Sequence, residues 1–509
     1  MPQSAAGHDC EPFLRAGVCE THTATLVFVG DRAYKFKKPV DLGFLDYTTV
    51  AARRAACERE VSLNRRFAPD VYVGLGEFRG PDAAAAPEPV VVMRRMPEDR
   101  RLSHLVRAGA AVDDVLRSVA RDLAAWHAAA PRSREVEEQG TRDALSARWE
   151  TNFEQLQALA AEGVGPEHVT EIEQLVHRYL AGRKRLFDSR IEQGRVVDGH
   201  GDLLAEDVFC LDDGPRVLDC LEFDDRLRYV DGLDDAAFLA MDLEQLGFPD
   251  YAAYFFARYG EYSADPAPPS LWHHYVAYRA FVRAKVSVIQ AHQGAPGAEA
   301  ASRSLAAIAL RHLRTSAVGL TLVGGLPGSG KSTLSGALAD RLGVTLLSSD
   351  RIRKELAGIP AEQSAAAGYG EGLYAPEWTA RTYATLLNRA ALLLASGESV
   401  VLDATWSDAI QREAAVQVAE HTSADLVALH CHVPGDVSVA RLSARPPGAS
   451  DAGAEIARSM AAREPAWPEA VPIDTSGALE SAVSQALTAV RPWGTGQAPV
   501  FRRPHMEPA

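Results

Sequence analysis

Two different patterns of apolar and polar residues follow one another along this chain. Residues 25–29 and 33–36 read as two strands around the turn at 30–31, which predicts a β-hairpin. Residues 47–67 then have the spacing of an amphipathic helix, and residues 89–93 form a short apolar run typical of a buried strand. The chain is therefore expected to begin with a small sheet and one helix.

Helical spacing dominates the middle of the chain, over residues 113–130, 145–187 and 271–314. Beyond it, apolar runs alternate with helical segments. Four of these runs read as strands, at 320–323, 344–347, 400–405 and 424–433. Strands that alternate with helices predict a parallel sheet covered by helices. A domain boundary is expected near residue 315, where the pattern changes.

A phosphate-binding motif follows the first of these strands. Residues 325–332, Gly-Leu-Pro-Gly-Ser-Gly-Lys-Ser, match G-x-x-x-x-G-K-[ST] at every fixed position and precede a predicted helix. Glycines allow backbone N–H groups to face phosphate oxygens, Lys331 is expected to reach the β- and γ-phosphates of ATP, and Ser332 to hold Mg²⁺. The candidate nucleotide-binding residues are Gly325, Gly328, Ser329, Gly330, Lys331, Ser332 and Thr333.

Charged residues after the next two strands extend this candidate site. Because the carboxyl ends of parallel strands share one edge of a sheet, Asp350 and Asp403 are expected to lie opposite the bound phosphates. Asp350 is the candidate general base for an attacking hydroxyl, although it could instead cap the following helix. Asp403 is expected to hold Mg²⁺ through water, and Arg353 to grip an anionic acceptor.

Two arginines after the fourth strand predict a lid. Arg441 and Arg445 are one turn apart on the predicted helix 436–445, which precedes a hinge rich in Pro and Gly at 446–453. Such a lid would neutralise charge on a transferring phosphate and exclude water. The alternative is two arginines that pair with surface carboxylates.

The first half of the chain carries a second set of candidate residues. Lys35 lies on a predicted strand, and Glu58 or Glu60 of the next helix could pair with it, although solvated side chains are the alternative. Carboxylates at or near strand ends complete the set: Asp202, Asp207 and Asp219.

The spacing of His200, Asp202, Asp207 and Asp219 resembles the catalytic segment of aminoglycoside-phosphotransferase-type kinases, over about residues 12–312. A narrower likeness is to the phosphotransferase-like module of bacterial two-domain ATP-binding proteins. It is carried by residues 34–39, 43–46, 63–66 and 219–223.

This resemblance implies a role for each candidate residue of the first half. Asp202 would orient or deprotonate an acceptor hydroxyl, Asp207 and Asp219 would bind Mg²⁺, and Lys35, braced by Glu60, would contact phosphate. Asp207 departs from the pattern, because the family has Asn there, and no G-x-G-x-x-G loop occurs near residues 21–25. An active kinase and a pseudokinase or ligand-binding module therefore both stay open.

The second half resembles P-loop kinases related to polynucleotide 5′-kinase, gluconate kinase and zeta toxins, of the AAA-family ATPase type, over about residues 318–490. The likeness rests on the phosphate-binding motif followed by residues 350–353, 403–405 and 441–445 in that order. It implies a last strand at 473–475, near the adenine.

Composition narrows the function classes. At 509 residues the chain is long enough for two or three domains, and its formal net charge of −15 disfavours a broad surface for nucleic acid or an anionic membrane. Six scattered cysteines indicate neither a zinc knuckle nor a disulfide framework. Without a recognisable signal or bilayer-spanning run, a cytoplasmic protein is expected.

Two further groups of polar residues have plain alternatives. An acidic cluster could recognise a cationic acceptor such as an amino sugar, although a solvated face is the alternative; its members are Asp224, Asp225, Asp231, Asp234 and Asp235. Two short segments, His273-His274 and His430-Cys431-His432, lack ligand-like neighbours and are interpreted as packing or surface residues.

The expected fold class is α/β. An N-terminal bilobal protein-kinase-like α+β domain is expected at 1–315, and a C-terminal P-loop NTPase domain with a doubly wound parallel sheet at 316–493, before a disordered tail at 494–509. The expected function is transfer of phosphate from ATP, with Mg²⁺, to a hydroxyl of a small molecule, nucleotide or nucleic-acid end, mainly through the second domain. The alternatives are an ATP sensor with a pseudokinase-like first domain, or a first domain that phosphorylates an aminoglycoside or amino sugar. Contact between the two kinase-like domains is left open.

Overall fold

A computed structural model describes residues 17–21, 23–41, 45–80, 86–159, 164–360, 363, 371–444, 457, 460–462 and 466–490. The chain divides into two compact units. The first unit contains Met1–Gly140 and Gly194–Asp265, and the second contains Thr141–Gln193 and Pro266–Ala509. The predicted domain boundary near residue 315 stays a prediction, and the predicted tail lies outside the described residues.

The first unit opens with a five-stranded antiparallel sheet in the order β1-β2-β3-β5-β4. Its strands are β1 (Gly17–Glu20), β2 (Ala24–Val29), β3 (Arg32–Lys37), β4 (Tyr72–Phe78) and β5 (Glu88–Arg94). Residues alternate between half-buried and buried along β3, so Ala33, Lys35 and Lys37 share the buried face. The predicted hairpin is confirmed, and two lysines on a buried face require anionic partners.

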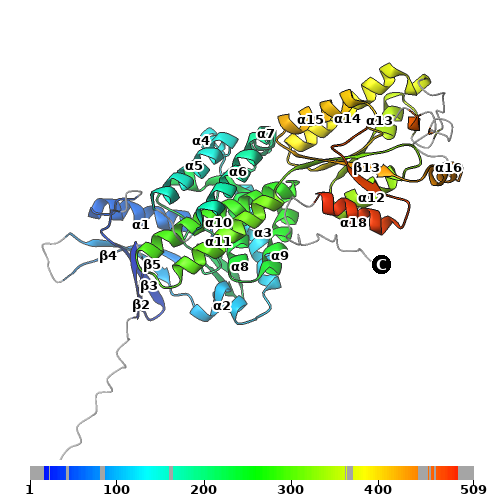
Figure 1. Cartoon of the computed structure of the whole chain (residues 1–509). Coiled ribbons are helices and arrows are strands. Elements are labelled where there is room, and N and C mark those ends of the chain that lie inside the picture. The colour runs from blue at the N-terminus through cyan, green and yellow to red at the C-terminus, as the bar shows by residue number, and fades with distance from the viewer. Residues whose placement is uncertain are drawn as a thin grey trace, which may run out of the picture. The chain divides into compact units, whose positions relative to one another are not determined.

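Helix α1 (Val50–Asn64) packs on β4 and β5 (Figure 1). Thr49 caps its start by accepting a hydrogen bond from the N–H of Ala52 at 3.1 Å. Cys57 and Val61 of α1 join the apolar core between helix and sheet. Glu60 is fully buried on this helix, where it can meet the lysines of β3.

Within its described residues, the rest of the first unit contains two small antiparallel sheets and five α-helices. One sheet pairs β6 (Val196–Asp198) with β9 (Tyr229–Asp231), which are far apart in the chain, and the other is the hairpin of β7 (Val208–Leu211) and β8 (Gly214–Val217). The helices are α2 (Leu102–Arg107), α3 (Asp113–Ala129), α4 (Arg134–Gln139), α8 (Gly232–Gln245) and α9 (Pro249–Ser263). The connections that follow β6 and β8 carry the predicted acidic residues.

The second unit begins with a group of helices around buried aromatic side chains. The helices are α5 (Arg142–Ala158), α6 (Pro166–Ala181), α7 (Lys184–Glu192), α10 (Pro269–His292) and α11 (Ala298–Thr315). Trp149 Nε1 donates to His274 Nε2 at 3.3 Å, and the His274 ring stacks on Tyr179 with centroids 4.4 Å apart. His273 Nδ1 lies 2.9 Å from His312 Nδ1. The prediction that this histidine pair serves packing is confirmed.

The same unit contains a five-stranded parallel sheet in the order β11-β12-β10-β13-β14. Its strands are β10 (Gly319–Gly324), β11 (Thr345–Ser348), β12 (Val400–Asp403), β13 (Asp425–His432) and β14 (Val471–Asp474). Its helices are α12 (Lys331–Leu342), α13 (Ser349–Leu356), α14 (Pro376–Ala395), α15 (Ala409–His421), α16 (Gly435–Ser443) and α18 (Leu479–Val490). In Figure 1, α12 and α18 lie on one side of the sheet and α14 and α15 on the other, which confirms the parallel sheet covered by helices.

Strand order places the functional edge of this sheet. The chain passes from β10 to β11 and β12 on one side, and then to β13 and β14 on the other. Loops therefore part at the carboxyl end of β10, which is where open α/β sheets bind ligands. Val323, Leu334 and Ile473 belong to the apolar core that fixes the central strands against α12 and α18.

Glycines allow close contacts within the second unit. A Cβ at Gly182 would lie 2.0 Å from the carbonyl oxygen of Thr422, just past α15. Arg183 Nη1 donates to this same oxygen at 2.7 Å, and Ser270 Oγ donates to the carbonyl of Gly397, just past α14, at 2.7 Å. The contacts satisfy carbonyls at helix ends, which have no partner inside the helix. Among the described residues, no helix has the length and apolar character that crossing a bilayer requires.

We expect His274→Gln to make the second unit less sensitive to acid. Burial lowers the pKa of His274 from 6.5 to about 3, so the unfolded chain binds a proton that the folded protein refuses. The stability that neutral His274 contributes is complete above pH 6.5 and is lost as the pH falls toward 3. Between these two pH values, the free energy of unfolding falls by about 1.4 kcal/mol for each pH unit. Gln keeps an acceptor for Trp149 and should remove this part of the slope.

Urea unfolding at several pH values below neutral measures the effect. His421→Gln is the matched control, because His421 is exposed at the end of α15 and should leave the slope unchanged. Equal slopes for wild type and His274→Gln would contradict the assignment.

Candidate functional site

The predicted phosphate-binding loop connects β10 to α12, and its shape requires glycine. Gly325, Gly328 and Gly330 have φ values of 137°, 83° and 86°. A Cβ at Gly325 would lie 2.6 Å from the carbonyl oxygen of Cys431, and one at Gly328 would lie 2.7 Å from that of Ser438. Residues with a side chain rarely adopt these φ values, and a Cβ would clash at Gly325 and Gly328. The backbone conformation of the loop therefore accounts for the motif glycines.

Hydrogen bonds hold the loop against neighbouring strand ends. The N–H of Gly325 donates to the carbonyl of Thr405 at 3.3 Å, and Thr475 Oγ1 donates to the carbonyl of Ser329. Helix α12 begins at Lys331, so its first N–H groups and positive dipole end adjoin the loop. The hydroxyl of Ser329 is buried and hydrogen bonds to no described residue, whereas Ser332 and Thr333 are exposed. The loop can present donors to an anion.

Asp403 is a buried carboxylate at the end of β12. Burial raises its pKa, and the charge of Lys331 and hydrogen bonds from Ser332 and Ser348 oppose this rise. Its Oδ1 atom is buried and has no hydrogen-bond partner within the described part of the chain. A partnerless carboxylate oxygen close to a serine hydroxyl fits Mg²⁺, which takes oxygen ligands.

Asp350 lies in the first turn of α13, directly after β11. Its charge acts on Asp403 and on the hydroxyl of Tyr383, which places the three groups in one neighbourhood. Ser348 is the N-cap residue of α13, and no side chain caps this helix end. The alternative prediction, that Asp350 caps the helix, is therefore wrong. A half-buried carboxylate near Lys331 and Asp403 can accept a proton from an acceptor held there.

Arg353, one turn later, is held by its own surroundings. Its Nη1 atom donates to the carbonyl of Leu373 at 2.9 Å and lies 3.2 Å from Thr379 Oγ1. The guanidinium also stacks over Tyr374 at 4.7 Å. These contacts with the 3₁₀ turn Gly372–Tyr374 and with α14 fix the arginine, and its role in binding an acceptor stays a prediction.

The structure brings one of the two predicted lid arginines to the loop. Arg441 Nη2 donates to the carbonyl of Thr475 at 2.7 Å. A Cβ added to Gly330 would lie 3.3 Å from Arg441 Nη1, so the guanidinium adjoins the phosphate-binding loop. Arg445 lies outside the described residues, and the two-arginine lid stays a prediction.

In the first unit, one carboxylate joins two lysines. Glu60 Oε1 lies 2.8 Å from Lys35 Nζ, and Glu60 Oε2 lies 2.7 Å from Lys37 Nζ. Lys35 also reaches Asp219 Oδ1 at 2.6 Å, and Lys37 pairs with Glu222. Burial opposes ionisation of Glu60, but the two ammonium groups hold its pKa below the ordinary value. Glu60, and not the exposed Glu58, is thus the partner of Lys35.

Sequence reasoning missed the second half of this ion chain. Lys37 and Glu222 were not singled out, nor was Tyr47, whose hydroxyl donates to Glu222 Oε1 at 3.1 Å. The signal was present, because Lys35 and Lys37 are two residues apart and must face the same side of a strand. Their partner Glu222 comes from a distant segment and could not be recognised from spacing.

The end of α1 ties Glu60 to the acidic segments. Asn64 Nδ2 donates to the carbonyl of Glu60 at 2.9 Å, and Asn64 Oδ1 accepts from the N–H of Cys220 at 2.8 Å. Asp219, next to Cys220, has a φ of 63°, a left-handed conformation that costs energy for a residue other than glycine. One amide therefore links the helix to the strained aspartate that meets Lys35.

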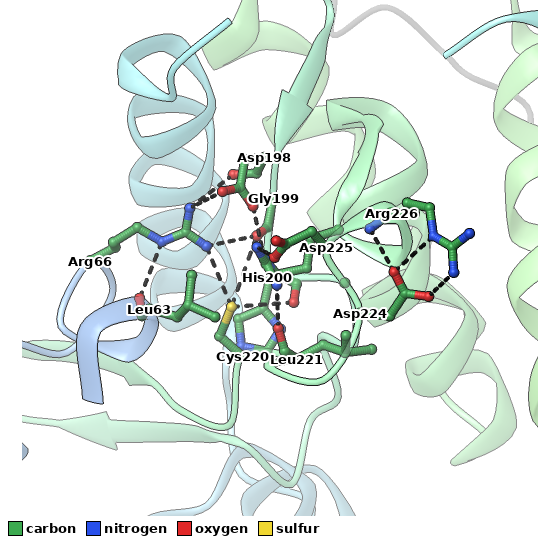
Figure 2. Close-up of polar contacts among 12 residues, drawn as sticks. Leu63, Arg66, Asp198, Gly199, His200, Cys220, Leu221, Asp224, Asp225 and Arg226 are labelled. Atoms are coloured by element: carbon green, nitrogen blue, oxygen red, sulfur yellow. Dashed lines mark hydrogen bonds and ion pairs between the residues drawn. The ribbon is translucent and has the colours of Figure 1, made fainter. Parts of the chain in front are cut away.

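Arg66 continues this connection, as Figure 2 shows. It follows α1 and donates through Nη2 to the carbonyl of Gly199 at 3.0 Å, while Nη1 lies 3.1 Å from Asp198 Oδ2. The N–H of Leu221 donates to the carbonyl of His200 at 3.1 Å. The segment around His200 and the segment around Asp219 are thereby held side by side.

Three acidic residues converge in these segments. The positive charge of Lys35 lowers the pKa of Asp219 to about 2. Desolvation, together with the charges of Asp219, Glu206 and Asp202, raises the pKa of Asp207 well above its ordinary value. Asp202 is half-buried after β6. Carboxylates that repel one another in this way form a donor set that suits a divalent cation such as Mg²⁺.

The predicted acidic cluster does not form one open surface. Asp231, Asp234 and Asp235 are buried, and Asp235 accepts hydrogen bonds from the N–H groups of His200 and Gly201 at 2.7 and 2.8 Å. Asp224 pairs with Arg226 and Asp225 with Arg228. A groove of free carboxylates for a cationic acceptor is not formed by these residues.

A parallel sheet of this order, with a G-x-x-x-x-G-K-S loop between its first strand and helix, defines a P-loop domain. Residues 320–465 match a family described as an AAA domain.

The whole chain has close relatives. It is 44% identical over 476 residues to "Uncharacterized protein Rv2004c" of Mycobacterium tuberculosis (strain ATCC 25618 / H37Rv), covering 94% of this chain and 95% of that protein. "Uncharacterized protein Mb2027c" of Mycobacterium bovis matches to the same extent. The chain belongs to the family of these mycobacterial proteins.

Solved structures show weaker likenesses. A putative kinase from Chloroflexus aurantiacus is 24% identical, covers 34% of this chain and 98% of its own, and has a TM-score of 0.28. A gluconokinase from Sinorhizobium meliloti is 20% identical, covers 34% of this chain and 91% of its own, and has a TM-score of 0.25. A choline/ethanolamine kinase family protein from Mesorhizobium loti is 14% identical, covers 59% of this chain and 92% of its own, and has a TM-score of 0.36.

Glu60→Gln should destabilise the first unit by about 3 kcal/mol, because removing one partner of a buried ion pair leaves the other charge uncompensated. Lys35 and Lys37 would then face a neutral amide in a buried position. Glu58→Gln is the matched control, since Glu58 is exposed on the same helix and should change stability by less than about 0.5 kcal/mol. The two variants are compared by urea unfolding of the full chain, with circular dichroism as the signal. The same midpoint for both variants would argue against a buried ion chain.

Proposed function

We propose that the protein is an ATP-dependent phosphotransferase that transfers the γ-phosphate of ATP to a hydroxyl group, mainly through its P-loop domain. One observation carries this proposal: the charges of Lys331 and Asp350 both act on the buried carboxylate of Asp403 at the end of β12, and the neighbouring loop has a backbone that only glycine permits. The match of residues 320–465 to an AAA domain supports nucleotide binding at this loop.

The residues of this edge divide into nucleotide-binding and acceptor-binding groups. Backbone N–H groups of the loop and the ammonium of Lys331 would bind the triphosphate. Ser332 and Asp403 would hold Mg²⁺, which supplies positive charge to the phosphate oxygens when it is bound. Asp350 would accept the proton of the attacking hydroxyl. Arg441, beside Gly330, would neutralise charge on the transferred phosphate.

The reaction balances with these groups alone. The acceptor oxygen forms a bond to the γ-phosphorus, the bond between that phosphorus and the β–γ bridging oxygen breaks, and ADP leaves. The acceptor proton passes to Asp350 and then to solvent. The products are ADP and a phosphate ester. We propose a small molecule, a nucleotide or a nucleic-acid end as the acceptor, because the net charge of −15 opposes an extended polyanion surface.

The first unit supports a second candidate function, an aminoglycoside-phosphotransferase-like kinase site. The observation that favours it is the contact of Lys35 with both Glu60 and Asp219, next to the crowded carboxylates of Asp207 and Asp202. Asp202 would serve the acceptor hydroxyl, and Asp207 and Asp219 would hold Mg²⁺. The rival from a different class is a sensor, in which ATP binding alters the protein without phosphate transfer.

Lys331→Ala in the full-length protein should lower acceptor-stimulated ADP release by about 100-fold or more, because the phosphates lose their ammonium partner at the transition state. The acceptor panel contains sugars, aminoglycosides, nucleosides and RNA 5′-ends. Lys35→Ala is the matched comparison in the first unit and should leave this release unchanged.

The outcomes separate the candidates. Loss in Lys35→Ala alone would move turnover to the first unit and overturn the proposal. Saturable ATP binding by the wild type, with no acceptor that stimulates ADP release, would favour the sensor.

Asp350→Asn should lower formation of phosphorylated product by about 100-fold or more and leave the Kd for ATP nearly unchanged, because only proton transfer is lost. Asp340→Asn is the control, since Asp340 is exposed on α12 and carries the same charge. Product yield, measured by mass spectrometry, is compared among the three proteins. Equal yield from Asp350→Asn would exclude Asp350 as the base.

A further inference from the structure

Three ligand-type side chains, none of them among the residues assigned above, meet on two helices of the second unit. Glu150 lies on α5, and Glu173 and His177 lie one turn apart on α6, which packs on α5. Their nearest nitrogen and oxygen atoms all lie within 4.8 Å of one another. His177 Nε2 is 2.6 Å from Glu150 Oε1. Spacing of four residues places Glu173 and His177 on the same face of α6.

The cluster carries more negative charge than its surroundings compensate. Two carboxylates approach one imidazole, and within the described residues neither Glu150 nor Glu173 forms an ion pair with lysine or arginine. Like charges this close repel unless a cation lies between them. The ring of Phe153, one turn from Glu150 on α5, meets the His177 ring edge-on with centroids 6.4 Å apart. The imidazole therefore has an aromatic neighbour on α5 in addition to its contact with Glu150.

Geometry and ligand type select the kind of ion. Ligand atoms around a tetrahedral Zn²⁺ lie roughly 3.4 Å apart, given bonds of about 2.1 Å. Side chains of Glu150 and His177 are 44% and 47% exposed, so rotation can close the remaining distance and water can complete the coordination. One imidazole with two carboxylates suits Zn²⁺ and related transition ions, whereas Mg²⁺ prefers oxygen alone.

We propose that Glu150, Glu173 and His177 form a binding site for a divalent transition-metal ion that links α5 to α6, with Zn²⁺ as the probe. Binding replaces the hydrogen bond between His177 and Glu150 by bonds from both to the ion, and it compensates the two carboxylates. The site is separate from the proposed Mg²⁺ ligands, all of which are oxygen atoms of other residues.

Equilibrium dialysis of the full-length protein against Zn²⁺, with excess Mg²⁺ to occupy oxygen-only sites, tests the proposal. We expect the wild type to bind one Zn²⁺ per chain and His177→Ala to bind none. Glu150→Gln and Glu173→Gln should bind Zn²⁺ more than about tenfold more weakly than the wild type. The glutamine variants keep the size of the side chains, and circular dichroism checks that each variant folds. Hydrogen exchange in α5 and α6 should slow when Zn²⁺ is added to the wild type.

His421→Ala is the matched control, because His421 is an exposed histidine of the same unit whose Nδ1 bonds to the carbonyl of Gln417. It should keep the bound ion. No Zn²⁺ on the wild type, or the same stoichiometry and affinity for folded His177→Ala, would overturn the proposal.

Discussion

A carboxylate removed from water must face a positive charge, and this constraint shapes both units of the protein. In the first unit Glu60 is fully buried between Lys35 and Lys37. In the second, Asp403 is buried where the charge of Lys331 reaches it. Glu60 lies on α1 and its two lysines on β3, so these ion pairs hold the helix against the sheet.

The two sites differ in how completely their charges are satisfied. Lys35 contacts Glu60 and Asp219, and Lys37 contacts Glu60 and Glu222, so the first site is a closed chain of opposite charges. A nucleotide would have to compete with Asp219 for Lys35. In the P-loop domain, Asp403 Oδ1 and the hydroxyl of Ser329 have no described hydrogen-bond partner. Unsatisfied buried groups favour a ligand, because leaving them unpaired costs free energy. This contrast supports the proposal that phosphate transfer takes place mainly at the second site.

How far the sequence predicts these sites depends on whether contacts are local. The phosphate-binding loop was predictable, because strand, glycines and helix are contiguous and their spacing defines the backbone. The strand carrying Lys35 was predictable from alternation. The choice between Glu58 and Glu60 depends on the exact rotation of α1 over the sheet, which periodicity does not fix. The contact of Lys37 with Glu222 joins residues far apart in the chain, and no local pattern encodes it.

A buried chain of hydrogen bonds holds the backbone around His200 in place in the first unit. Sequence spacing could not predict this chain either. Tyr259 contacts His127 at 2.8 Å, His127 contacts Asp235 at 3.0 Å, and Asp235 accepts from the backbone at His200.

Glycines make room for this chain. A Cβ at Gly199 would lie 2.5 Å from Asp235 Oδ2, and one at Gly232 would lie 2.6 Å from the Tyr259 hydroxyl. Because α3, α8 and α9 supply its three side chains, the loop that carries Asp202 is positioned by the packing of these helices rather than by its own sequence.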